Sequence, residues 1–245
     1  MDLTKPGCLN VLTHNDPLSL HVYTDSGRFY RVDDHQYPGV GTVLNSSDSI
    51  DQQKFWKKWR AVPENQAYSE QAKNRGSLFH AVVEHHFRKS NDPVINALAA
   101  AQLSKVKPFW ESVQDVLPRI TDIQLIESAV WHSIGHYAGT VDMVASFDDV
   151  PCILDWKTAT KPKQLEYCDR YALQLSAYCG CINRMYGTRI KHGVIVVALP
   201  NAEAQVFQFP LADYWPLWLD RLKAYWEKES SPLSEKALKA IRDEY

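Results

Sequence analysis

The chain of 245 residues lacks several features that would place it in a specialised class of protein. It has no run of roughly 18 or more apolar residues, so the sequence predicts no membrane-spanning helix. It has no excess of positive charge, because 27 Lys and Arg stand against 29 Asp and Glu, for a formal net charge of -2. A protein that packages DNA needs a basic field over its whole surface, whereas an enzyme needs only a local basic groove. The composition therefore argues against a packaging role.

Paired cysteines and a targeting segment are also missing. The five cysteines include no CxxC spacing, which favours free thiols in a reducing compartment. Before Arg28 the only Lys or Arg is Lys5, so the N-terminus resembles neither a signal peptide nor an Arg-rich transit peptide. We therefore expect a cytoplasmic protein without membrane association. What is abundant is aromatic surface, since 8 Trp and 12 Tyr suit a packed core and, where exposed, stacking on nucleobases.

Helical periodicity dominates the first half of the chain, and strand-like patterns dominate from residue 123 onward. The order of elements predicts an α/β (α+β) fold, in which a central mixed β-sheet is flanked by helices and preceded by an N-terminal helical region. The expected elements are a hairpin over 18–32, a loop around 38–47, helices over 52–60, 74–89 and 94–116, strands over 123–131, 137–147 and 150–158, a helix over 163–186, strands over 193–199 and 204–209, and a helix over 211–228.

Three charged residues on one expected hairpin form the first candidate site. Strand alternation can place the carboxylates of Asp142 and Asp155 on one side of the sheet, and Lys157 shares the face of Asp155. Buried carboxylates are costly, and a divalent cation offsets that cost. Such a cation polarises a phosphate and lowers the pKa of a bound water, while an ammonium stabilises the developing charge. Spacing alone leaves a plainer interpretation open, namely a surface salt bridge between Asp155 and Lys157.

Further motifs, in order, make this pattern resemble a known family. Gly139-x-x-Asp142 followed by Asp155-x-Lys157 resembles the nuclease core of the PD-(D/E)XK superfamily, in its RecB-like branch. The likeness runs from about residue 37 to 228 and is greatest for single-strand DNA exonucleases of the mitochondrial genome maintenance type and their bacterial and phage relatives. The other matching motifs are Arg75-Gly76-x-x-x-His80, Glu127 before the GxxD strand, and Gln174-x-x-x-Tyr178.

The resemblance implies a restriction-endonuclease-like core and a set of residue roles. His80, Asp142 and Asp155 would be ligands of one or two Mg²⁺ or Mn²⁺ ions, and Lys157 would assist the attacking water. Glu127 would be an auxiliary acid near the metal. Gln174 and Tyr178, one helical turn apart, would brace the lysine and the DNA. We also expect Arg75, Lys161 and Lys163 to contact nucleic acid.

The implied function is a metal-dependent exonuclease that hydrolyses single-stranded DNA in repair, recombination or replication-end processing. An endonuclease of the same fold and a catalytically silent DNA-binding module stay open as alternatives. We expect a monomer of bacterial or phage origin, with a mitochondrial location less favoured. Within one domain over 1–245, we expect an N-terminal β-hairpin extension over 1–36, a helical region carrying His80 over 37–122, a catalytic core over 123–228 and a helical tail over 229–245.

Other readings of particular motifs are less favoured. His80-x-x-x-Glu84 has one residue too many for an inverted zinc-peptidase motif, and His132 and His136 are expected to be structural. No Cys follows Cys181, so no iron–sulfur cluster is expected. The segment 55–60 (FWKKWR) is predicted to bury its aromatic rings and solvate its bases, although stacking of the rings on a single strand stays open.

Overall fold

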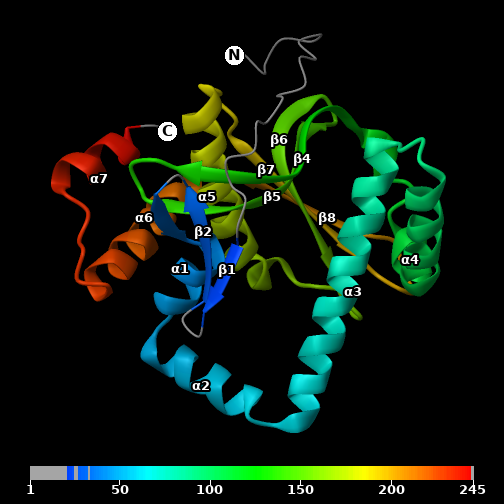
Figure 1. The fold of residues 1–245 in the computed structure, drawn as a ribbon, viewed down its shortest axis with the longest axis horizontal. Helices are drawn as coiled ribbons and strands as arrows, with labels where there is room; N and C mark the ends of the chain where they lie inside the picture. Colours follow the sequence, from blue (N-terminus) through cyan, green and yellow to red (C-terminus); the bar gives the residue numbers. More distant parts are fainter. Residues whose placement is uncertain (1–20, 25–26, 33, 244–245) are drawn as a thin grey trace.

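The computed structural model describes residues 21–24, 27–32 and 34–243, and these form two β-sheets and a set of helices (Figure 1). Cys8, residues 18–20 and the 25–26 turn of the expected hairpin lie outside the described residues. The strands are β1 (His21–Thr24), β2 (Gly27–Val32), β3 (His35–Pro38), β4 (Ile120–His132), β5 (Tyr137–Phe147), β6 (Val150–Thr158), β7 (His192–Ala198) and β8 (Gln205–Pro210). The helices are α1 (Val40–Ser46), α2 (Ile50–Arg60), α3 (Pro63–Arg88), α4 (Pro93–Ser112), α5 (Asp169–Tyr186), α6 (Leu211–Lys228) and α7 (Glu235–Arg242), with 3-10 turns η1 (Leu117–Arg119) and η2 (Leu165–Tyr167).

The larger sheet has the order β4-β5-β6-β7-β8 and is mixed, as predicted. Its neighbouring strands are antiparallel except for β6 and β7, which are parallel. A parallel pair needs a long crossover connection, and α5 supplies it. The tight turn between β5 and β6 is made by Asp148 and Asp149, whose φ angles of 48° and 64° fit a two-residue hairpin turn.

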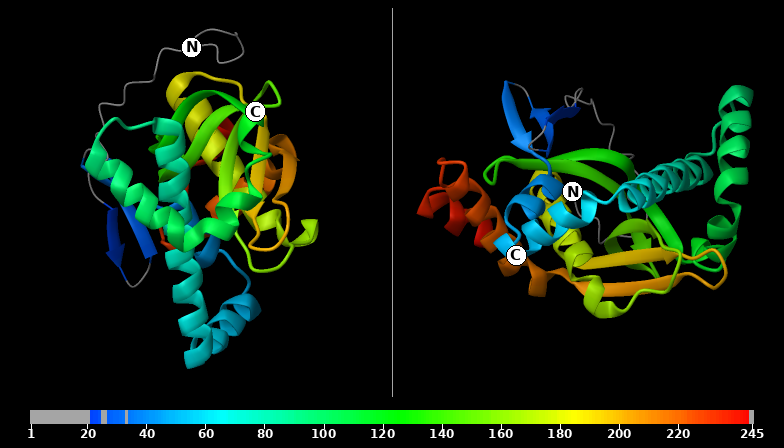
Figure 2. Two further views of the ribbon diagram at one scale, coloured as in Figure 1. Left: turned by 90° about the vertical axis from the view of Figure 1, so that its right-hand side faces the viewer. Right: turned by 90° about the horizontal axis from the view of Figure 1, so that it is seen from below.

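Helices cover both faces of this sheet, and each face has its own hydrophobic core (Figures 1 and 2). Residues of α1, α5 and α6 fill one core, in which the rings of Trp215 and Trp218 are buried as expected for a packing helix. Residues of α3 and α4 fill the other, where the ring of Phe79 on α3 lies 6.1 Å from that of Trp156 on β6. Strands β5 and β6 are therefore packed from both sides. No helix in the described ranges combines the length and apolar character needed to cross a bilayer.

Several elements differ from the sequence-based expectation. The loop expected over 38–47 is wrong, because helix α1 occupies most of it and buries Val40, Val43 and Leu44. These three residues have helical spacing, but the glycines at 39 and 41 obscured it. The region expected to be helical over 37–122 also differs at both edges, because strand β3 ends at Pro38 and strand β4 begins at Ile120. The helix expected from residue 74 begins at Pro63, a proline placed at the first turn where its missing N–H costs nothing.

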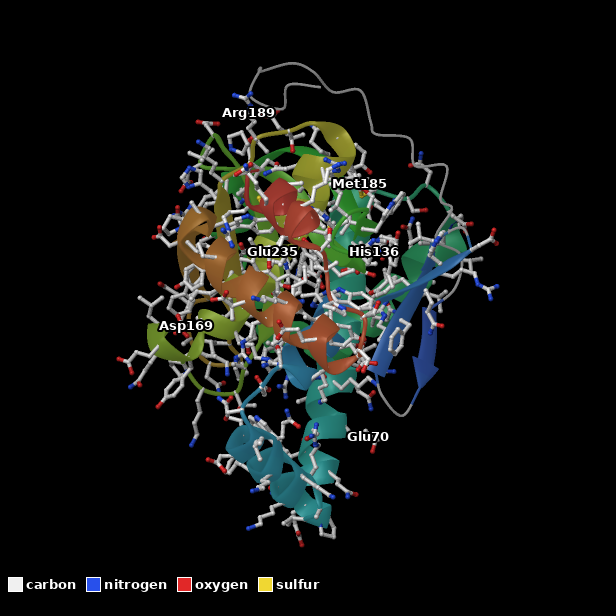
Figure 3. All side chains as sticks on the ribbon, turned by 90° about the vertical axis from the view of Figure 1, so that its left-hand side faces the viewer. Glu70, His136, Asp169, Met185, Arg189 and Glu235 are labelled. Atoms are coloured by element: carbon white, nitrogen blue, oxygen red, sulfur yellow. The ribbon has the colours of Figure 1, made fainter. Side chains whose placement is uncertain are left out.

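Helix α2 and the first half of α3 project from the body of the molecule (Figures 1 and 2). Figure 3 shows Glu70 on this projecting half of α3. The expectation that α2 buries its aromatic rings is wrong, because Phe55 is 57% exposed and Trp56 is 43% exposed. An amphipathic pattern predicts burial only when a neighbour covers the apolar face, and α2 has no buried residue.

Candidate active site

The site begins where two strands of the sheet separate. The antiparallel pairing of β5 with β6 runs from Phe147↔Val150 to Met143↔Leu154 and stops one step before Asp142 and Asp155. Instead of a backbone pair, the Asp142 side chain enters the fork, and its Oδ2 accepts a hydrogen bond of 2.9 Å from the Trp156 backbone N–H. The two carboxylates are 8% and 1% exposed, so the fork buries both.

Helix α3 brings His80 into the same fork. The Nε2–H of His80 donates to the Trp156 carbonyl at 3.0 Å, which fixes the ring. That bond directs Nδ1 toward two carboxylates, at 2.9 Å from Glu127 Oε1 and 3.5 Å from Asp142 Oδ2. The ring orientation is therefore the one that presents Nδ1 as a ligand, with the other nitrogen held by a backbone carbonyl.

Glu127 reaches this cluster through an unusual backbone conformation. Its neighbour Ile126 packs in the core beneath α3 and α4, so regular alternation along β4 would direct Glu127 to the opposite face. Glu127 instead has a φ of 43°, in the left-handed region that is costly for a residue with a side chain. This breaks the alternation, and the carboxylate meets His80 on the α3 side. Strain of this kind gathers at functional sites.

The nitrogen and oxygen atoms of His80, Glu127 and Asp142 lie within 4.8 Å of one another and could hold a metal ion. The set expected from the resemblance was His80, Asp142 and Asp155. The structure brings Glu127 into the cluster, while the Asp155 carboxylate is ion-paired with the Lys157 ammonium. That Asp155 is a metal ligand stays a prediction, and Glu127 becomes a further candidate ligand.

Burial and mutual repulsion shape the acid–base properties of the cluster. Burial raises the pKa of Asp142, and it raises the pKa of Asp155 to about 6. Burial alone would lower the pKa of His80, but Asp142 and Glu127 outweigh it and raise that pKa to about 9. In the metal-free protein the imidazole is therefore protonated on both nitrogens, and positively charged, at neutral pH. Asp155 Oδ2 contacts the Lys157 ammonium, whereas Oδ1 is buried without a hydrogen-bond partner among the described residues, which leaves Oδ1 suited to a cation.

Lys157 is held as a cation. Burial works against its ammonium, but the carboxylates of Asp155 and Asp142 prevail and raise its pKa above the usual value. The Nζ atom also lies 5.2 Å from the centre of the Tyr171 ring. The side chain is thus charged and held beside Asp155, and its role toward the attacking water stays a prediction.

Gln174 and Tyr178 of α5 lie together as predicted, with Gln174 Nε2 donating to Tyr178 Oη at 3.0 Å. Burial raises the pKa of Tyr178 well above its usual range, so the phenol is neutral and can donate its proton in a hydrogen bond. A Cβ on Gly139 would lie 2.4 Å from the Tyr178 ring. The two motifs are therefore physically coupled, because the glycine of GxxD makes room for the tyrosine of QxxxY.

The residues expected to contact nucleic acid lie beside β6 or on the segment that follows it. Arg75 Nε donates to Thr158 Oγ1 at 3.1 Å, next to Lys157, and the guanidinium lies 5.1 Å from the Phe109 ring. Lys161 is exposed and Lys163 is half-buried in the segment that follows β6. The structure thus places Arg75 beside the site and both lysines on the chain leaving it.

One further expectation is confirmed, and two features were missed. His132 is structural as expected, since it is buried and stacks on Tyr137 at 5.1 Å. The backbone of Trp156, which bonds Asp142 and His80, was missed, because no side-chain pattern signals a backbone role. The approach of β2 to β5 was also missed, because the sequence does not show that the N-terminal strands pack near the site.

Comparison with known proteins assigns the family. A model of the PD-(D/E)XK nuclease superfamily matches residues 55–242. The chain belongs to this superfamily. It is similar to mitochondrial genome maintenance exonuclease 1 of Mus musculus, with 31% identity over 79% of this chain and 60% of the relative. The same-named protein of Homo sapiens is 35% identical over 50% of this chain and 38% of the relative. That of Xenopus tropicalis is 31% identical over 78% of this chain and 58% of the relative. The chain spans at most 60% of the length of these relatives.

Members of the PD-(D/E)XK superfamily use divalent metals, and the fork fits such an ion. Its donors are carboxylate oxygens and one imidazole nitrogen, a set that suits Mg²⁺ or Mn²⁺ better than a soft metal. The mixed sheet flanked by helices agrees with the restriction-endonuclease-like core of the superfamily.

Proposed function

We propose that the chain is a metal-dependent exonuclease that hydrolyses phosphodiester bonds of single-stranded DNA. The observation that carries the proposal is the fork between β5 and β6, where buried carboxylates, a fixed imidazole and a held ammonium converge. The exonuclease part draws on the names of the relatives, of which this chain spans only a part.

Each residue has a role that its geometry supports. His80, Glu127 and Asp142 would hold Mg²⁺ or Mn²⁺, and Asp155 of β6 is a candidate further ligand. That ion supplies polarisation of a phosphate oxygen and a lowered pKa for a bound water. Trp156 fixes the ring of His80 and the carboxylate of Asp142 through its backbone, so little reorganisation is needed.

Lys157 and Tyr178 act on the phosphate as donors. Because the pKa of Lys157 is raised, the side chain serves as a cation that stabilises developing negative charge and orients water, and it does not accept a proton. The neutral Tyr178 phenol, supported by Gln174, can donate to a phosphate oxygen.

The rim and the projecting helix favour a single strand. Arg75, Lys161 and Lys163 supply positive charge near the fork, although the whole chain has a net charge of -2. The exposed rings of Phe55 and Trp56 on α2 provide flat faces for unpaired bases, with Lys57 and Lys58 beside them. A base inside a duplex has no free face, so such rings suit single-stranded DNA.

Hydrolysis of end-labelled single-stranded DNA tests the proposal. Wild type is expected to cleave with Mg²⁺ or Mn²⁺ and to stop in EDTA. Lys157→Ala is expected to lower kcat by about 10² to 10³, the usual cost of one lost donor to transition-state charge. Lys236→Ala, an exposed lysine on α7, is the matched control and should cleave as wild type does. Equal rates for wild type and Lys157→Ala would contradict the mechanism, and no cleavage by wild type would favour a silent DNA-binding module.

A further inference from the structure

The N-terminal sheet lies outside the residues matched by the superfamily model, yet it reaches the active-site strand. The matched region begins at residue 55, whereas β1, β2 and β3 end at Pro38. Tyr30 Oη on β2 lies 3.2 Å from Thr140 Oγ1 on β5, and Gly39 forms a bridge with Ala138. This small sheet therefore presents side chains of its own to the catalytic strand.

The backbone of Arg28 lies on β2, the central strand of the N-terminal sheet, and α1 holds it as well. The Thr42 hydroxyl of α1 accepts from Arg28 N at 2.9 Å and donates to Arg28 O at 2.8 Å. Gly39 N donates to the same carbonyl at 2.8 Å. The preceding Gly27 has a φ of 137°, and a Cβ there would lie 2.5 Å from the Thr42 hydroxyl. Gly27 thus permits the close approach that sets the direction of the Arg28 side chain.

The guanidinium of Arg28 is directed to the strand that carries Asp142. Its Nη2 donates to Thr140 Oγ1 at 3.3 Å, and its Cζ lies 4.8 Å from the centre of the Tyr30 ring. Thr140 precedes Asp142 by two residues on β5, which is roughly 6.6 Å along a strand. Gly139, the residue before Thr140, approaches Tyr178 so closely that a Cβ there would lie 2.4 Å from the tyrosine ring, so the contacts of Arg28 and of Tyr178 fall on neighbouring residues of β5.

We propose that Arg28 binds a phosphate of the DNA strand next to the phosphate being cleaved, and so positions the strand in the fork. The inference rests on the proposed function. Three carboxylates, those of Glu127, Asp142 and Asp155, line the fork beside the single ammonium of Lys157, so a further cation nearby helps to hold a polyanion. Arginine suits this task because its planar, always charged group matches a phosphate with two parallel donors. Arg28 is a positioning residue and not part of the metal site.

Binding of a fluorescein-labelled oligothymidylate, measured by anisotropy in EDTA over a range of NaCl concentrations, tests the inference. Arg28→Gln is expected to raise Kd roughly 10-fold and to reduce the slope of log K against log salt by about 0.7, the value for one phosphate contact on a single strand. Arg31→Gln is the matched control, an exposed arginine on the opposite face of β2, and should keep the wild-type slope. In steady-state cleavage with Mg²⁺, Arg28→Gln should raise KM by a similar factor and change kcat much less.

Two further variants separate charge from folding. Arg28→Lys keeps the charge and should restore the salt slope, while Thr140→Val removes the hydrogen bond and should raise Kd with the slope unchanged. If Arg28→Gln keeps the wild-type Kd and salt slope, the inference is wrong. It is also wrong if Arg28→Lys binds the strand weakly and shows the same reduced slope as Arg28→Gln. If wild type cleaves single-stranded DNA and Arg28→Gln binds normally, only this inference fails. If wild type does not cleave it, the proposed function fails and this inference falls with it.

Discussion

At the scale of single residues, His80 links protonation to metal binding. Its Nε2–H is committed to the Trp156 carbonyl, so any ion must bind at Nδ1, where the metal-free protein keeps a proton. The two carboxylates that raise the pKa of His80 to about 9 are the same groups that attract the ion. Protons and metal therefore compete for one nitrogen.

We expect metal binding to release about one proton per site below pH 9 and to tighten as pH rises from 6.5 to 9. The sign follows from the raised pKa, because below about 9 the ion must displace the proton. Calorimetric titration with Mn²⁺ in buffers of different ionisation enthalpy measures the release. His80→Gln should abolish it, and His192→Gln, an exposed histidine at the start of β7, should leave it unchanged. Metal affinity that does not vary with pH would contradict this assignment of Nδ1.

The sequence predicted the residues of the site better than their geometry. The motif residues Asp142, Asp155 and Lys157 could be found because their spacing on a hairpin is regular. The left-handed φ of Glu127 could not be found, because it depends on the contact with His80 from a helix far away in the sequence. Arg28 could not be found either, because its role depends on which strand the N-terminal sheet packs against.

At the scale of elements, α2 shows where pattern and packing disagree. Its capping box at Ser49 and Gln52 and its amphipathic sequence predict a helix correctly. The same pattern predicted burial, and that was wrong because α2 projects from the core without a covering neighbour (Figure 2). Propensity and capping act locally and can be read from sequence, whereas burial depends on tertiary context. In helix α1 the local sequence and the packing disagree in the other direction. Its glycines favour a loop, but burial of one face stabilises a helix.

Trp56→Ala on α2 is expected to weaken binding of single-stranded DNA without weakening the fold. Stacking of one base on an aromatic ring contributes about 1–3 kcal/mol, so Kd should rise by roughly 5- to 150-fold. Because Trp56 is exposed, the temperature of thermal unfolding should change little. Ile50→Ala, an exposed apolar residue without a ring on the same helix, is the control. Equal effects of the two variants on Kd would show that the ring does not stack on a base.

At the scale of the whole molecule, the fold class followed from the order of helices and strands, and the superfamily match agrees with it. With a net charge of -2, the proposed attraction to DNA would have to come from local groups such as Arg75 and Lys161. The binding of a strand is then expected to weaken steeply with salt. The choice between an exonuclease and an endonuclease is also a property of the whole molecule, because it depends on how the strand enters.

A closed single-stranded circle distinguishes these two activities. An exonuclease needs a free end, so the circle should persist under conditions in which the same circle, opened once, is degraded. The comparison is made at equal nucleotide concentration with Mg²⁺, and products are followed on a denaturing gel. Cleavage of the intact circle at the rate of the opened one would replace the exonuclease proposal with an endonuclease of the same fold.

The backbone of Trp156 carries a consequence for evolution. Its N–H and C=O point into the fork, where a paired strand would normally satisfy them, and the side chains of Asp142 and His80 take the place of that strand. Loss of either side chain leaves a buried peptide group without its partner, at a cost of about 1–3 kcal/mol. Many active sites trade stability for activity, so that inactive variants become more stable. Here folding and chemistry both require a hydrogen-bonding side chain at these two positions, so a lineage that no longer needs catalysis would still be under pressure to keep a hydrogen-bonding group at each.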